Sequence, residues 1–192
     1  DRSPSRGLGD VYKRQDQGSL RETDNTYDMA IQGNGFFAIK VVDKNGDSSI
    51  KYTRNGQFTI TNEGYVVDVD GNRLQGANGD VQVPVDATDV AIKLNGAVYA
   101  NGEQVDTITL TDFEDYNYLD LYGDNMYNAV DGATTKSSTA TILQGFTEQS
   151  NVNVVDEMVS MITITRAYEA GQKMIKTQDS LLEQAVSSVG KV

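Results

Sequence analysis

The chain has 192 residues and a mass of 20.9 kDa, and its 28 acidic residues outnumber 16 basic ones, giving a formal net charge of −12. An acidic surface repels nucleic-acid phosphates and anionic lipid headgroups, so we expect neither nucleic-acid binding nor membrane insertion. The sequence has no histidine, cysteine or tryptophan, which excludes Ser-His-Asp triads, cysteine nucleophiles, disulfides and zinc sites built on histidine or cysteine.

Residues 1–15 differ from the rest of the chain. They contain Arg2, Arg6, Lys13 and Arg14 against two acidic residues, and they show no hydrophobic periodicity. We interpret this segment as a disordered or non-native leader and exclude it from the fold. A native basic arm is the alternative.

From residue 17 to about residue 113, apolar residues alternate with smaller or polar ones, as in Phe37, Ile39 and Val41. This period of two predicts strands with one buried face. Asn-Gly pairs separate the strands, and both residues of such a pair tolerate the positive φ of a type I′ hairpin turn. The predicted fold is therefore a mainly β, antiparallel, hairpin-rich domain without crossover helices. The pairs start at Asn34, Asn45, Asn55, Asn78, Asn95 and Asn101.

Two short motifs in this region resemble ligand sites but predict turns and strands. Gly33 to Ala38 fits a loose dinucleotide fingerprint, yet the segment that follows alternates like a strand, whereas the fingerprint needs a helix. Asp68 to Asn72 resembles the start of a calcium loop, but its glycine is misplaced and no glutamate closes the loop. A hairpin turn explains it better. We expect no cofactor and no metal.

Residues 114–139 are expected to form a loop with a short turn, followed by a return strand over residues 140–146. Carboxylates gather at the start of this stretch, and a pair of them could in principle catalyse glycoside hydrolysis. Without aromatic platforms or a nucleophile, base and orienting group, they predict a solvated acidic face, so the protein is not expected to be an enzyme. The carboxylates are Asp112, Glu114, Asp115, Asp120 and Asp124.

The pattern changes near the carboxyl end and predicts one long helix over residues 154–188. Asn151 or Asn153 can cap it, and Asp156 and Glu157 are favourably placed in its first turn. Apolar residues recur every seven positions, which keeps one row facing a partner helix. A second row, Met158, Thr165, Gln172, Asp179 and Val186, carries polar interruptions. The candidate helix-packing residues are Val154, Met158, Met161, Tyr168, Ile175, Leu182 and Val189.

About 35 residues at 1.5 Å each make a helix of about 52 Å, longer than a small β domain can cover. We therefore expect its far end to pack against other helices, from this chain or from neighbouring chains. The alternative is an amphipathic helix that lies flat on its own sheet.

Several motifs occur together in a distinctive order: Asp28-Met-Ala-Ile-Gln-Gly-Asn-Gly-Phe-Phe37, Tyr52-Thr-Arg-Asn-Gly-Gln-Phe58, Gln144-Gly-Phe146, and Ser150-Asn-Val-Asn-Val154 before Glu157-Met-Val-Ser-Met-Ile162 and Arg166-Ala-Tyr-Glu169. In this order the chain resembles the flagellar rod and hook protein family over about residues 16–192. Its short middle region is more similar to rod than to hook proteins, and to the distal rod subunit more than to a proximal one. The family-motif residues of the β domain are Gly33, Gly35, Phe36, Phe37, Arg54, Gly56 and Phe58.

The resemblance implies a structural subunit of the flagellar basal-body rod, which self-assembles into a helical hollow shaft that transmits torque to the hook and lets exported subunits pass. It implies a leader at 1–15, an outer β domain at 16–147 and an axial coiled-coil segment at 148–192. The resemblance also implies an N-terminal partner helix, which we expect to be missing from this sequence. The implied partners are further copies of the chain, other rod proteins, the hook protein and surrounding ring proteins.

The implied location is the basal body in the cell envelope, reached by flagellar export without a cleavable signal peptide. Another flagellar axial protein, or an extracellular β-rich adhesin, is the alternative. For Arg54, charge-assisted contact with an acidic neighbour is the expectation, and an exposed strand arginine of little energetic consequence is the alternative.

Overall fold

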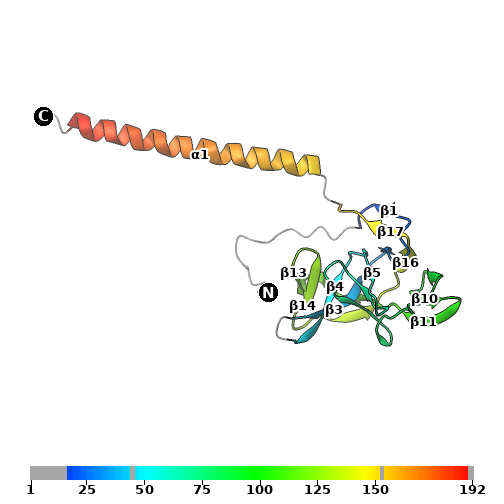
Figure 1. Cartoon of the computed structure of the whole chain (residues 1–192). Coiled ribbons are helices and arrows are strands. Elements are labelled where there is room, and N and C mark those ends of the chain that lie inside the picture. The colour runs from blue at the N-terminus through cyan, green and yellow to red at the C-terminus, as the bar shows by residue number, and fades with distance from the viewer. Residues whose placement is uncertain (1–16, 44–45, 152–153, 190–192) are drawn as a thin grey trace. The chain divides into compact units, whose positions relative to one another are not determined.

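The computed structural model describes residues 17–43, 46–151 and 154–189, which form two compact units (Figure 1). One unit lies within Gln15–Asn151, contains the strands, and is called the β unit below. The other contains the helix α1, Val154–Val189. The predicted leader at residues 1–15 lies outside the described residues. The elements of the β unit are β1 Leu20–Glu22, β2 Met29–Gln32, β3 Phe36–Val42, β4 Ser48–Thr53, β5 Thr59–Ile60, β6 Val66–Val67, β7 Arg73–Gly76, β8 Gly79–Asp80, β9 Val90–Ile92, β10 Ala97–Ala100, β11 Glu103–Thr107, β12 Leu110–Phe113, the 3₁₀ turn η2 Tyr116–Tyr118, β13 Leu119–Tyr122, β14 Met126–Ala129, β15 Thr135–Ser137, β16 Thr141–Gln144 and β17 Phe146–Glu148.

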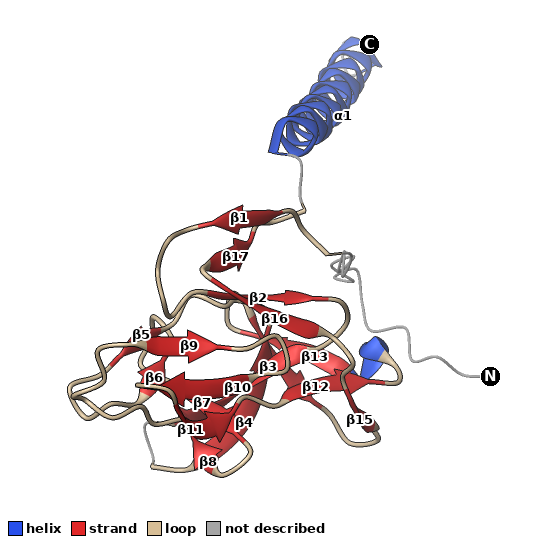
Figure 2. Ribbon diagram, turned by 90° about the vertical axis from the view of Figure 1, so that its right-hand side faces the viewer, coloured by secondary structure: helices blue, strands red, loops and turns tan. Residues whose placement is uncertain are grey.

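A ten-stranded sheet dominates the β unit, in the order β13-β14-β4-β3-β7-β6-β5, with β12, β15 and β8 attached beside this path. The hairpin of β3 and β4 is its longest pairing, from Phe37 opposite Thr53 to Val42 opposite Ser48. Three smaller sheets complete the unit: β11-β10-β9, β16-β2 and β1-β17 (Figure 2). The predicted fold, antiparallel β structure followed by one carboxyl-terminal helix, is confirmed.

The β unit has two hydrophobic clusters, which meet at β3. Successive side chains of a strand point to opposite faces, and Phe37 and Ile39 belong to the larger cluster while Phe36 belongs to the smaller one with Phe113 and Leu119. The expectation of one buried face is wrong for β3. Apolar residues cover both faces of this strand, because one of the two clusters packs on each face.

The Asn-Gly pairs form several kinds of turn. Asn101 and Gly102, between β10 and β11, have φ of 51° and 86°, as the predicted type I′ turn requires. Asn45 lies outside the described residues, and in the other pairs the asparagine does not adopt positive φ, so the type I′ prediction is wrong there. In the turn before β10, for example, Gly96 adopts a left-handed conformation with φ of 85°, whereas Asn95 does not.

The turn predicted at Asp68 is confirmed. The Asp68 carboxylate accepts hydrogen bonds from the backbone N–H groups of Asp70 and Asn72, each at 2.9 Å, and the Asp68 N–H donates to the Asn72 carbonyl. The acidic side chain therefore closes a reverse turn.

The loop predicted for residues 114–139 is wrong for much of its length, because β13, β14 and β15 lie within it. β13 and β14 form a hairpin there, and β14 pairs with β4, so the segment extends the central sheet. Leu119 and Met126 are buried, and Tyr127 packs edge-on against Phe36 at 5.5 Å between ring centroids. Burial against β3 and β4, which are distant in sequence, gives this tyrosine-rich segment its strand structure.

The helix α1 spans 36 residues without interruption and begins at the residue that the sequence predicts. Asp156 and Glu157 lie in its first turn, where the positive end of the helix dipole favours negative charge. At 1.5 Å per residue its length is about 54 Å. Within the described residues, no helix combines the length and apolar character that a membrane crossing needs.

Candidate functional site

The loop between β2 and β3 depends on two of the family-motif glycines. Gly33 and Gly35 have φ of 113° and 145°, a region that side chains with a Cβ rarely adopt. A Cβ on Gly35 would lie 2.7 Å from Ser138 Oγ, and one on Gly33 would lie 3.1 Å from the Cβ of Ala140. The loop therefore packs closely against residues 138–140, where Ser138 donates to the Asn34 carbonyl, while the carbonyls of Gly33 and Gly35 face Arg54.

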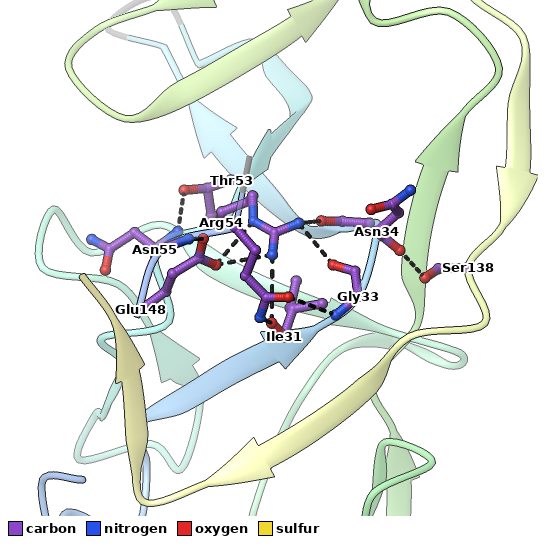
Figure 3. A network of polar contacts seen from close by, with 11 residues as sticks. Ile31, Gly33, Asn34, Thr53, Arg54, Asn55, Ser138 and Glu148 are labelled. Carbon is purple, nitrogen blue, oxygen red and sulfur yellow. Dashed lines mark hydrogen bonds and ion pairs between the residues drawn. The ribbon is translucent and has the colours of Figure 1, made fainter. Parts of the chain in front are cut away.

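Arg54, directly after β4, fills the space next to these carbonyls (Figure 3). Its Nη1 donates to the carbonyls of Gly33 at 3.1 Å and Gly35 at 3.0 Å, and its Nη2 donates to the carbonyl of Ile31 at 3.4 Å. Nε lies 3.0 Å and Nη2 lies 2.9 Å from Glu148 Oε2. The five N–H donors of the guanidinium group are thus all used.

The Arg54–Glu148 pair is largely shielded from water, with side-chain exposures of 20% and 12%. Shielded charges are expensive to leave unpaired, so removal of either partner costs more than loss of an exposed ion pair. Removal of Arg54 would also leave the loop carbonyls without their donors. Arg54, Glu148 and the carbonyls that they bind form a polar cluster, which holds β2, β4 and β17 to one another.

The same cluster includes the first described residues of the β unit. The Gln17 side chain donates to the Ile31 carbonyl at 2.7 Å and accepts from the Gly33 N–H at 3.2 Å. The Gly18 N–H donates to Glu148 Oε1 at 2.9 Å. A Cβ on Gly18 would lie 1.8 Å from the Gln149 carbonyl oxygen, so the two chain ends of the unit run in direct backbone contact.

The other family-motif residues support this cluster from the main core. The rings of Phe37 and Phe58 pack edge-on at 5.3 Å between centroids, and both are buried. Gly56 lies against β2, where its carbonyl accepts the Met29 N–H at 2.8 Å. The structure therefore brings the seven family-motif residues together around the start of β3 and the end of β4.

The helix-packing residues predicted on α1 lie on an exposed row. Met161, Tyr168, Ile175 and Leu182 have exposed fractions of 60–69%, and Val154 and Met158 are also exposed. Val189 is the last residue of the helix, and its side chain lies outside the described residues. These are large apolar side chains, and exposed groups of such residues mark protein–protein contact surfaces.

Threonines of α1 have their hydroxyl groups satisfied within the helix. Thr163, Thr165 and Thr177 donate to the carbonyls of Val159, Met161 and Lys173 at 2.8–2.9 Å. Thr165 belongs to the row with polar interruptions. Because its hydroxyl already has a partner, this residue can enter a helix interface without a buried unpaired donor.

The acidic stretch near β12 contains a structural carboxylate. Asp112 is buried, accepts the Tyr116 hydroxyl at 2.7 Å, and lies 3.2 Å from Lys136 Nζ. Burial opposes its ionisation, but hydrogen bonds from Tyr116, the Phe113 N–H and Lys136 outweigh burial and lower the pKa of Asp112. Burial, and then the bond to Asp112, raise the pKa of Tyr116 to about 12.

Sequence reasoning named Arg54 but missed Gln17 and Glu148. Arg54 and Glu148 are 94 residues apart, and no local pattern links them. The sequence offered one signal for Glu148, its position between the family motifs Gln144-Gly-Phe146 and Ser150-Asn-Val-Asn-Val154.

Comparison with known proteins gives two family matches. Residues 143–188 match the carboxyl-terminal segment of the flagellar basal body rod FlgEFG proteins, and residues 30–100 match the D1 domain of the flagellar hook proteins FlgE/F/G. The flagellar basal-body rod protein FlgG of Caulobacter vibrioides is 34% identical over 188 residues, covering 91% of this chain and 69% of the relative.

Two further relatives are similar to the same extent. FlgG of Bacillus subtilis is 33% identical over 183 residues, covering 88% of this chain and 67% of the relative. The flagellar basal-body rod protein FlgF of Caulobacter vibrioides is 34% identical over 178 residues, covering 92% of this chain and 71% of the relative.

Proposed function

The chain belongs to the flagellar basal-body rod protein family, and we propose that its helix α1 packs with helices of other subunits into the wall of a hollow shaft. The protein is a structural subunit of the bacterial flagellum. In this proposal the axial segment at 148–192 forms the inner tube, and the β domain at 16–147 forms the outer wall. Head-to-tail contacts between identical subunits do not close on themselves and so produce a helical filament.

The exposed apolar row of α1 is the observation that carries this proposal. Thirteen large apolar side chains of the helix have exposed fractions between 54% and 72%: Val154, Val155, Met158, Val159, Met161, Ile162, Ile164, Tyr168, Met174, Ile175, Leu181, Leu182 and Val186. Burial of such a side chain contributes about 1.5–3 kcal/mol. An adhesin that acts as a separate globule has no use for this surface, whereas a helical array buries it.

The apolar surface is widest at the start of the helix. Seven of the eleven residues from Val154 to Ile164 are apolar, and they surround more than half of the helix at 100° per residue. Farther along, the apolar residues form a narrower stripe. A helix that is apolar on most sides is normally buried, so we propose that the first three turns contact more than one neighbouring helix.

The proposed assembly also implies partners, an export route and a mechanical role for this chain. The partners would be further copies, other rod proteins, the hook protein and the ring proteins around the rod. The subunit would leave the cell through the flagellar export apparatus without a cleavable signal, and would transmit torque from the motor to the hook. A catalytic role is not part of this proposal.

We propose the distal segment of the rod as the position of this subunit. Similarity to FlgG and to FlgF is comparable at 33–34% identity, so complementation decides between them. A full-length version should restore motility to a strain that lacks FlgG and should not restore it to one that lacks FlgF. The reverse result would place the subunit in the proximal rod.

Ile175→Asp in a full-length background tests the helix interface. It should abolish rod assembly and motility, because a charge would be buried between helices. Thr177→Asp is the matched control, since it adds the same charge about 160° around the helix and should retain motility. Isolated rods and swimming in soft agar give the readout, and the melting of the β unit should be unchanged in both variants. Motility with Ile175→Asp would contradict the proposed interface.

A further inference from the structure

We propose that Arg54 and Glu148 form a mechanical latch, which keeps β17 on the β unit when force pulls on the chain beyond Asn151. This idea rests on the proposed function, because a rod subunit that transmits torque carries force between its helix and its β unit. The latch itself is a property of the β unit alone, since its residues lie within Gln15–Asn151. It can therefore be tested without a flagellum.

The pairing of β1 with β17 determines how force acts on the β unit. The strands are antiparallel, with Leu20 opposite Glu148 and Glu22 opposite Phe146, so the chain enters and leaves at the same end of the ribbon (Figure 2). A force that separates these two chain ends opens the pairs one after another, beginning at Glu148. Such sequential opening gives little resistance, because the bonds do not share the force.

The ribbon has little strength of its own. It contains three residue pairs and is a two-stranded sheet, and an isolated two-stranded ribbon is at best marginally stable in water. Outside the paired residues, the Gln149 N–H donates to the Ser19 carbonyl at 2.8 Å, and the two side chains are linked at 3.1 Å. These contacts are at the opening end and would break first.

The latch lies at the first residue pair of the β1–β17 ribbon that opening would reach, Leu20 opposite Glu148. Glu148 is the last residue of β17, and its two carboxylate oxygens bind different parts of the unit: Oε1 accepts the Gly18 N–H, and Oε2 accepts from Arg54. Arg54 in turn binds the carbonyls of Ile31, Gly33 and Gly35. Force on Glu148 therefore passes through a rigid planar guanidinium group into β2, β3 and β4, instead of separating one strand.

Single-molecule pulling on the full chain, with handles at its two termini, tests this latch. Glu148→Gln keeps the shape of the side chain but removes its charge, and Arg54→Lys keeps the charge but removes the fork of donors. Under the same load, both variants should unfold the β unit about tenfold faster than the parent chain, the expected effect of losing a charged hydrogen bond. The released chain, roughly 470 Å for about 135 residues, identifies the event.

Arg73→Met provides the matched control. Arg73 also pairs with a shielded carboxylate, with Nη1 2.9 Å from Asp80 Oδ2, but it lies on β7, away from the chain ends. This variant should lower the melting temperature, and it should unfold under load at the parental rate. A latch predicts this separation between thermal and mechanical stability, whereas a general stabilising role does not.

Two results would overturn the latch. One is parental unfolding under load in Glu148→Gln and in Arg54→Lys; the other is a loss of mechanical stability in Arg73→Met that matches its loss of thermal stability. Either result leaves the rod proposal standing, because the helix-interface variants test that proposal separately. If Glu148→Gln does not fold, Arg54→Lys alone decides the question.

Discussion

Replacing Gly56 by alanine should destabilise the β unit strongly, although the glycine has an ordinary backbone conformation. Gly56 does not adopt positive φ, so conformational strain is not the reason. A Cβ at this position would lie 1.5 Å from the carbonyl oxygen of Met29 and 2.6 Å from its carbonyl carbon. The methyl group therefore cannot be accommodated unless β2 moves away.

The size of the effect follows from the surroundings of β2. Met29, Ala30 and Ile31 are fully buried, so the strand has no free direction in which to move. Overpacking costs about 1–3 kcal/mol, and loss of the bond from the Met29 N–H to the Gly56 carbonyl adds about 0.5–1.5 kcal/mol. A total of about 1.5–4.5 kcal/mol should lower the melting temperature by roughly 5–20 °C in a unit of this size.

The experiment compares thermal and urea unfolding of full chains that differ at one glycine. Gly102→Ala is the first control: no atom lies within 4 Å of its Cβ position, but φ is 86°, so it should cost about 1–2 kcal/mol through strain alone. Gly171→Ala, in the exposed middle of α1, should leave the melting of the β unit unchanged. If Gly56→Ala melts within about 2 °C of the parent chain, the steric argument is wrong.

Three further predictions concern the two hydrophobic clusters and the polar groups beside them. The pKa of Tyr116 is raised from 10.0 to about 12, so its contribution to stability is complete below pH 10 and is lost as the pH rises towards 12. The urea midpoint of the parent chain should therefore fall between pH 10 and pH 12. If the midpoint of a Tyr116→Phe variant falls as steeply with pH, Tyr116 is not the responsible group. The pKa of Asp112 is lowered, so its contribution is present above pH 3.8 and is lost as the pH falls below that value. Phe36→Ala and Phe37→Ala should each cost about 3–5 kcal/mol, and their effects should add within about 0.5 kcal/mol because the rings lie in separate clusters. Strong coupling in the double mutant would show that β3 does not separate two cores.

The sequence by itself determined the features that depend on local periodicity. The alternation around Phe37, Ile39 and Val41 predicted a strand because a strand presents successive side chains to opposite faces. The seven-residue spacing from Met161 to Leu182 predicted one long helix with an apolar row because the helical period is short and regular. The turn at Asp68 was predictable for a similar reason, since its hydrogen bonds reach only four residues along the chain.

Only the tertiary structure decided which distant segments meet. It placed Phe36 and Phe37 in different clusters, gave β14 a partner in β4, and brought Glu148 to Arg54 across 94 residues. The period of a strand specifies which side chains share a face, but not what packs against that face. Likewise, the residues next to an arginine in the sequence do not identify the carboxylate that pairs with it. Those outcomes depend on strand order, which follows from the burial free energy of the whole β unit and not from any local segment.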